Sequence, residues 1–144
     1  MTATNPTFSS VEVGDELHQR SFPVSRETLI RYAGASGDFN IIHWNERAAR
    51  EVGLPDVIAH GNYTAALGIR FIVDWCGDPT AVREYGVRFA RPVVVPDDAA
   101  GASVEISGVV AVKNDDGTVR IDLTVTSDGQ KVLAQPRATL RLAP

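Results

Sequence analysis

The hydrophobic positions of this 144-residue chain change their spacing about midway. In the first half they recur at helical intervals, whereas in the second half apolar and polar residues tend to alternate as they do in strands. A helix is expected to begin at Ser25, a good N-cap, and to end at Gly37, which readily takes the left-handed conformation. A second, short helix is expected between Asn45 and Gly53.

A third helix is expected over residues 62–75, which are apolar on nearly every side, so we expect this helix to be buried. The strands expected around it are Leu17–Phe22, Val82–Pro92, Ala102–Lys113, Val119–Thr126 and Val132–Leu142. Asp-Gly turns at residues 114–117 and 127–130 favour hairpins, and therefore an antiparallel meander. Pro136 indicates an edge position or a bulge in the last strand. The predicted class is α+β, with a sheet wrapped around one helix.

Composition limits the function further. Hydrophobic residues make up 44% of the chain and charged residues 22%, as expected for one globular domain over residues 1–144, with 1–7 as a flexible N-terminus. The net charge of -4 argues against nucleic acid and anionic membranes as partners. Cys76 is the single cysteine, so no disulfide forms within the chain. Residues 1–7 do not resemble a secretory signal, and the longest apolar segment is too short for membrane insertion, so a cytoplasmic protein is expected.

One short segment carries residue types suited to acid/base chemistry. Asp38 and His43 stand five residues apart, directly after the glycine expected to end the first helix. On a regular helix this spacing would separate the two side chains, but Gly37 releases the chain into a loop. The carboxylate and the imidazole can then converge as a general acid/base pair. The alternatives are a turn-forming aspartate and a structural histidine.

The same segment resembles the signature of the MaoC-like (R)-specific enoyl-thioester hydratases, also called hydratase 2. The residues that carry the resemblance are Tyr32, Gly37, Asp38, Asn40, Ile42, His43 and Ala49, together with the segments Ala59–Gly61 and Val87–Val93. Blocks such as Val52–Leu54 and Trp75–Pro79 are most similar to the catalytic B subunit of actinobacterial (3R)-hydroxyacyl-ACP dehydratases. The resemblance implies a single hotdog fold, an antiparallel sheet wrapped around a long central helix.

The resemblance also implies a role for each residue of the site. Asp38 and His43 would form the catalytic dyad, and Asn40 would support their loop by hydrogen bonds. Gly61 would donate its backbone N–H to the oxyanion of the thioester, at the positive end of the buried helix. This chemistry requires no cofactor and no metal. We interpret His60 as a structural or pocket-shaping residue, because the sequence shows no Cys, Asp or Glu at ligand spacing from it.

The expected reaction is hydration of an enoyl-CoA or enoyl-ACP, running physiologically as (3R)-hydroxyacyl-thioester dehydration in type II fatty acid (mycolic acid) elongation. The partners implied are an acyl-ACP or acyl-CoA substrate and a second hotdog subunit, in a heterodimer or a homodimer. Two alternatives remain open. One is a hotdog thioesterase, and the other is a non-catalytic subunit that shapes the tunnel of a catalytic partner.

Two of the departures from the family pattern concern the dyad loop and a supporting serine. Ile41 replaces a proline, so a slightly more mobile dyad loop is expected. Ile69 stands where some hydratases carry a supporting serine, so this helper is expected to be absent. Arginines are candidates for contacting the phosphates of a carrier, although each is more commonly a solvated surface residue. These candidates are Arg70, Arg83, Arg88 and Arg91.

Overall fold

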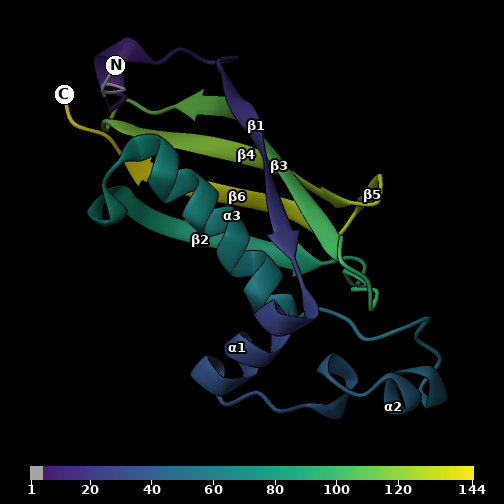
Figure 1. The fold of residues 1–144 in the computed structure, drawn as a ribbon. Helices are drawn as coiled ribbons and strands as arrows, with labels where there is room; N and C mark the ends of the chain where they lie inside the picture. The colour runs from purple at the N-terminus through teal and green to yellow at the C-terminus, as the bar shows by residue number, and fades with distance from the viewer. Residues whose placement is uncertain (1–4) are drawn as a thin grey trace.

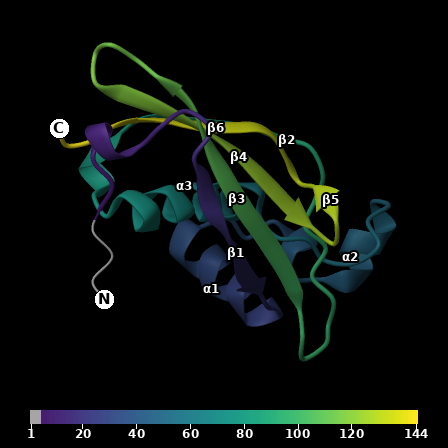
Figure 2. The same ribbon diagram turned by 90° about the horizontal axis from the view of Figure 1, so that it is seen from above.

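A computed structural model describes residues 5–144 as an antiparallel sheet wrapped around one long helix (Figure 1). Helix α3 (Gly61–Cys76) lies along one face of the sheet, and Figure 2 shows the same layers from above. Helices α1 (Arg26–Ser36) and α2 (Glu46–Glu51) lie beyond the N-terminal end of α3. The predicted α+β class and its central helix are confirmed.

The strand order differs in part from the predicted meander. The six strands are β1 (Glu16–Val24), β2 (Val82–Phe89), β3 (Ala102–Lys113), β4 (Thr118–Ser127), β5 (Gln130–Lys131) and β6 (Leu133–Arg141). Their order is β1-β3-β4-β6-β2, with β5 beside β4. The meander is correct for β3, β4 and β6 but wrong for β2, which pairs with β6 at the far edge. The connection after β2 does not turn back as a hairpin because Val93 and Val95 bind the backbone of Val57 and Ala59.

The turns form as predicted, and Pro136 marks a bulge. Asp128 and Gly129 both have positive φ, 49° and 68°, as a two-residue hairpin requires. In β6, which is not an edge strand, Gln135 has a φ of 51° and the register with β2 shifts between Gly86 and Arg88. A proline can remain inside the sheet at this point because the bulge removes the need for its N–H.

The helix boundaries follow the predicted caps. The Ser25 hydroxyl accepts a hydrogen bond from the Thr28 N–H at 3.1 Å, and Gly37 ends α1 with a φ of 77°. The Asn45 side chain accepts from the Ala48 N–H at 3.0 Å at the start of α2.

Helix α3 is covered by the sheet on one side, and its other side carries exposed residues. A stripe at four-residue spacing is exposed: Asn62, Ala66, Arg70 and Asp74. The sheet of a single chain covers only the opposite face, whose Leu67, Phe71 and Ile72 are almost inaccessible to solvent. Charges are tolerated on the open stripe, where Asp74 forms an ion pair with Arg20 at 2.7 Å.

Helix and sheet are in close contact at Gly68. The hydroxyl of Tyr85, on β2, donates to the Ala65 carbonyl at 2.7 Å, and a Cβ on Gly68 would overlap that hydroxyl. Cys76 is buried, as a small apolar residue would be.

The segment at residues 1–7 is described only in part. Residues 1–4 lie outside the described residues, and Thr7 forms a β-bridge with Ala143. Within residues 5–144, no helix is long and apolar enough to cross a membrane.

Candidate active site

The loop after α1 brings Asp38 and His43 together. Asp38 follows the left-handed Gly37, and its carboxylate accepts a hydrogen bond from the Asn40 N–H at 3.1 Å. The Asn40 side chain accepts in turn from the Ile42 N–H at 3.3 Å and begins the single turn η2 (Ile41–His43). This turn changes the direction of the chain, which a continuous helix would not do. His43 therefore lies beside Asp38.

His43 is held in one orientation. Its ring is only 7% exposed, and Nδ1 lies 2.7 Å from the carbonyl oxygen of Ile58. A carbonyl oxygen accepts only, so Nδ1 carries the proton and Nε2 carries the free lone pair. Burial lowers the pKa of His43, with a contribution from the neighbouring His60, while the Ile58 hydrogen bond and Asp38 oppose this shift. At neutral pH the imidazole is therefore uncharged and able to act as a base.

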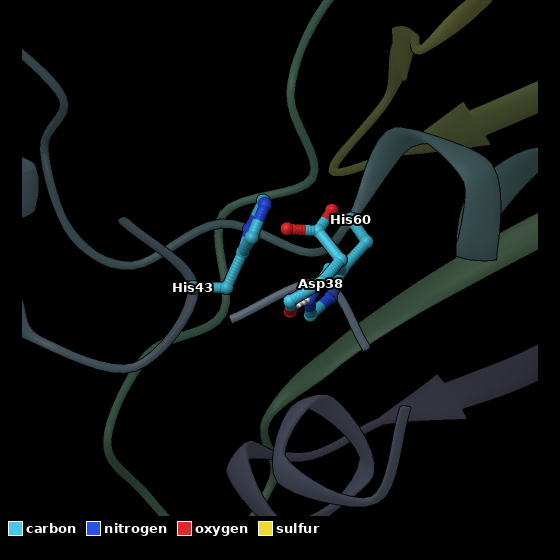
Figure 3. Close-up of side chains that lie close together, drawn as sticks. All are labelled: Asp38, His43 and His60. Carbon is cyan, nitrogen blue, oxygen red and sulfur yellow. Dashed lines mark hydrogen bonds between the residues drawn. The ribbon is translucent and has the colours of Figure 1, made fainter. Parts of the chain in front are cut away.

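Three potential proton carriers meet at this point. One ligand atom each from Asp38, His43 and His60 lies within 4.8 Å of the others. Figure 3 shows the Asp38 carboxylate facing the His43 ring, with His60 drawn beside Asp38. The sequence predicted the first two as a pair, whereas the position of His60 against them was not predicted. Their catalytic assignment stays a prediction.

This trio is poorly arranged to hold a metal ion. The rings of His43 and His60 stack with centroids 3.8 Å apart and planes tilted by 26°. Histidine binds metals through lone pairs in the ring plane at about 2 Å, so two stacked rings do not direct both lone pairs at one ion. The arrangement suits proton transfer better than metal ligation.

A cavity of about 270 Å³ opens beside His43. Its lining residues are His43, Ile58, Ala59, Gly61, Thr64, Phe89, Ala90, Arg91, Pro92, Val93, Val132 and Leu133. The exposed Asp38 is not among them. A cavity of about 910 Å³ adjoins this one at Arg91 and Pro92, and one of about 490 Å³ lies between β4 and β6, but neither includes Asp38, His43 or Gly61, so the smaller cavity is the one placed for acid/base chemistry.

Gly61 is the first residue of α3, directly after the N-cap His60. Its N–H is one of those that a helix leaves without an intrahelical acceptor, in the positive end of the helix dipole. A Cβ at this position would lie 3.0 Å from the ring of Phe89. Glycine therefore keeps the cavity open beside a free donor, which is the geometry that an oxyanion requires.

Sequence reasoning missed Thr64. The threonine is 4% exposed, lines the same cavity, and its hydroxyl donates to the His60 carbonyl only at a long 3.5 Å. Its spacing of three residues from Gly61 places both on one helix face, which is a signal the sequence did contain. The hydroxyl beside the cavity thus comes from Thr64, whereas Ile69 does not line it.

Of the four candidate arginines, only Arg91 lines this cavity. Arg70 instead approaches Asp74 at 3.8 Å on the open face of α3. Arg83 and Arg88 are exposed on β2.

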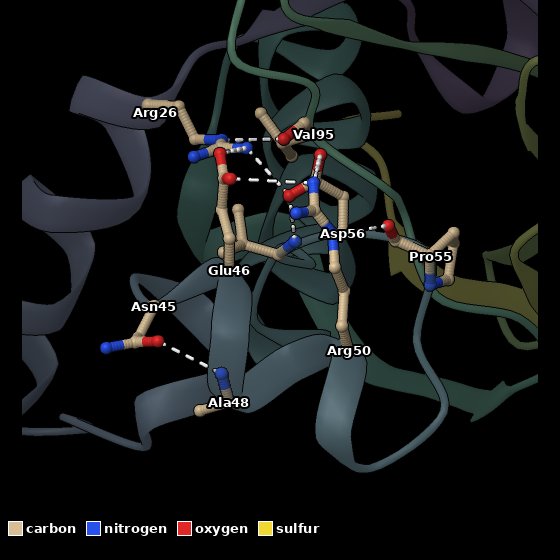
Figure 4. A network of polar contacts seen from close by, with 9 residues as sticks. Arg26, Asn45, Glu46, Ala48, Arg50, Pro55, Asp56 and Val95 are labelled. Atoms are coloured by element: carbon tan, nitrogen blue, oxygen red, sulfur yellow. Dashed lines mark hydrogen bonds and ion pairs between the residues drawn. The ribbon is translucent and has the colours of Figure 1, made fainter.

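The two helices that flank the dyad loop are joined by ion pairs (Figure 4). Arg26, at the start of α1, donates to Glu46 on α2 at 3.1 Å and to Asp56 at 2.9 Å. It also donates to the Val95 carbonyl at 2.7 Å. Because these groups are only partly exposed, their charge-assisted hydrogen bonds tie the start of α1 to the start of α2, which follows the loop.

Comparisons with known proteins find similar sequences and similar folds. The 3-hydroxyacyl-thioester dehydratase X of Mycobacterium tuberculosis is 51% identical over 69 residues, which is 48% of this chain and 24% of that protein. A solved MaoC-like dehydratase is 40% identical with a TM-score of 0.93, over 96% of this chain and 43% of the other. A (3R)-hydroxyacyl-ACP dehydratase HadBC complex of M. tuberculosis, 19% identical, shares the fold with a TM-score of 0.66, over 88% of this chain and 94% of the other.

This chain spans about a quarter or less of the curated relatives it matches. Within the chain, the model of the family described as MaoC like domain matches residues 9–128, which include the loop, most of the cavity lining and most of the sheet. The family predicted from the sequence is therefore confirmed, and the chain belongs to the MaoC-like domain family.

Proposed function

We propose that the chain is an (R)-specific enoyl-thioester hydratase that runs physiologically as a (3R)-hydroxyacyl-thioester dehydratase in fatty acid elongation. The observation that carries the proposal is the convergence of Asp38 and His43 within 4.8 Å, beside a cavity whose wall includes Gly61. The names of the dehydratase relatives support the same reaction class.

The proposed roles of these residues cover each step of the hydration. A water molecule held between Asp38 and His43 gives a proton to the Nε2 lone pair of His43 as its oxygen bonds to C3. The imidazolium formed then gives a proton to C2, so that the dyad ends in its starting charge state. The Nε2 lone pair of His43 is the free base on the imidazole. Negative charge on the thioester oxygen is stabilised by the Gly61 N–H. Dehydration is the same sequence reversed, and neither direction consumes a cofactor.

The proposal includes a second hotdog subunit and a carrier-bound substrate. Strand β2 is an edge strand, and Phe89 near its end is 60% exposed beside Gly61. A second sheet at this edge would pair the free backbone groups of β2 and cover the cavity. The heteromeric HadBC complex supports a non-identical partner. Arg91 at the cavity is the candidate contact for the phosphates of acyl-CoA or acyl-ACP. We place the reaction in the cytoplasm, in elongation that leads to mycolic acids.

The test is hydration of crotonyl-CoA, followed by loss of the enoyl absorbance, with the protein alone and with a candidate hotdog partner. We expect Asp38→Asn and His43→Asn each to lower kcat by about 10²–10⁴-fold. His18→Asn is the matched control, because His18 is exposed on β1 and should be replaceable without loss. Thiol release in place of hydration would identify a thioesterase. Full activity in both dyad variants would refute the assignment.

A further inference from the structure

His60 is a fully buried polar residue that the proposed chemistry does not use. It is 1% exposed and stands immediately before α3 as its N-cap residue. Its ring lies 4.8 Å from the ring of Tyr32 on α1 and stacks on His43 at 3.8 Å. Burying an imidazole costs free energy unless its polar atoms find partners, so each nitrogen needs to be accounted for.

Only one of the two nitrogens has a partner. His60 Nε2 lies 3.0 Å from the backbone carbonyl oxygen of Asp38, and the bond is drawn in Figure 3. Because that carbonyl only accepts, Nε2 is the protonated nitrogen. Nδ1 is buried and has no hydrogen-bond partner among residues 5–144. The ring is therefore placed as a hydrogen-bond donor to the dyad loop, at the cost of one unpaired acceptor.

The same ring contacts both members of the dyad. Its Nε2 hydrogen-bonds to the backbone carbonyl of Asp38, and its face stacks on the imidazole of His43. Asp38 is exposed, and its other contacts are local: its N–H donates to Ser36 at 3.2 Å and its carboxylate accepts from Asn40. His60 thus ties the Asp38 end of this exposed loop to the buried start of α3, where Gly61 also lies.

We infer that His60 is a positioning residue that fixes the relative positions of the Asp38 carboxylate, the His43 imidazole and the Gly61 N–H. This inference rests on the proposed hydratase function. A displacement of about 1 Å at a reacting group can cost about 10²-fold in rate, so one hydrogen bond to the loop is enough to matter. The effect should fall on kcat rather than on KM, because His60 is not among the residues that line the cavity.

The test compares His60→Gln with His60→Met. Glutamine extends its amide nitrogen to about the position of Nε2 and keeps the donor, whereas methionine has a similar length and no donor. We expect kcat for crotonyl-CoA hydration to stay within about 10-fold of the wild type in His60→Gln and to fall about 10²-fold in His60→Met, with little change in KM. Thermal unfolding is recorded for both variants. If His60→Met does not fold, His60→Asn replaces it, since its amide is too short to reach Asp38.

A second measurement is independent of activity. Amide hydrogen exchange in the Asp38–His43 loop should keep its wild-type rate in His60→Gln and rise in His60→Met, because only methionine releases the Asp38 carbonyl. Equal kcat in the glutamine and donor-free variants, or equal exchange rates in the two, would overturn the inference. A wild type that does not hydrate crotonyl-CoA with any partner would refute the proposed function, and the exchange measurement would still test the positioning.

Discussion

Replacing Gly61 by proline would remove the proposed oxyanion donor while keeping the helix. Proline has no N–H, yet it is favoured at the first position of a helix, where that N–H has no intrahelical acceptor. The residue before a proline must be extended, and His60 already has φ -59° and ψ 132°. We therefore expect Gly61→Pro to fold with a melting temperature close to that of the wild type.

The matched control is Gly61→Ala, which keeps the N–H. Its Cβ would lie 3.0 Å from Cε1 of Phe89, and that ring is 60% exposed and free to rotate away. Both variants share this steric change, so their difference reports mainly the donor. Loss of one oxyanion donor costs about 10²–10³-fold in kcat, or about 2.7–4 kcal/mol of transition-state stabilisation. We expect Gly61→Pro to fall below Gly61→Ala by that factor.

The assay is kcat for crotonyl-CoA hydration, measured for both variants beside their thermal unfolding curves. A proline variant that is folded and as active as the alanine variant would refute the role of this N–H. A fall in both variants to the same low rate would show that glycine is needed for space alone.

Two further predictions concern packing and pH. Gly68→Ala should destabilise the protein by about 1–3 kcal/mol, because the added Cβ would overlap the Tyr85 hydroxyl. In a Tyr85→Phe background the same change should be neutral or stabilising, because the higher helix propensity of alanine then dominates. Urea unfolding of the wild type, the two single variants and the double variant checks this. Because burial lowers the pKa of His43, the midpoint of the acid limb of kcat/KM should lie below about pH 6.5. The free energy of unfolding should also fall with decreasing pH, because His43 takes up a proton at a higher pH in the unfolded chain than in the folded one. A midpoint above that pH would contradict the assignment of His43 as the base.

Much of the fold could be predicted because its signals are local. Ser25, Gly37 and Asn45 act through hydrogen bonds or dihedral angles within a few residues, so the sequence around them determines the helix ends. The Asp-Gly turns are local in the same sense. The Asp38–His43 loop was also predictable, since a glycine stop followed by a short spacing leaves few conformations.

The features that sequence reasoning missed depend on contacts between distant residues. The position of β2 beside β6 depends on how residues 90–101 bind the segment before α3. The stack of His60 on His43 joins a loop to a helix terminus, and no periodicity reports it. Exposure of the stripe along α3 was missed because only Asn62, Arg70 and Asp74 mark it within an otherwise apolar helix.

The order of the site residues along the chain has a consequence for how such domains diversify. Asp38, His43, His60 and Gly61 all lie within residues 38–61, between the first helix and the central helix. None of the sheet's named strands passes through this segment, so exchanging it need not alter strand register. A hotdog subunit can therefore gain or lose these side chains through the exchange of one segment. An active subunit and an inactive partner could in this way descend from one ancestor while keeping matching sheet edges.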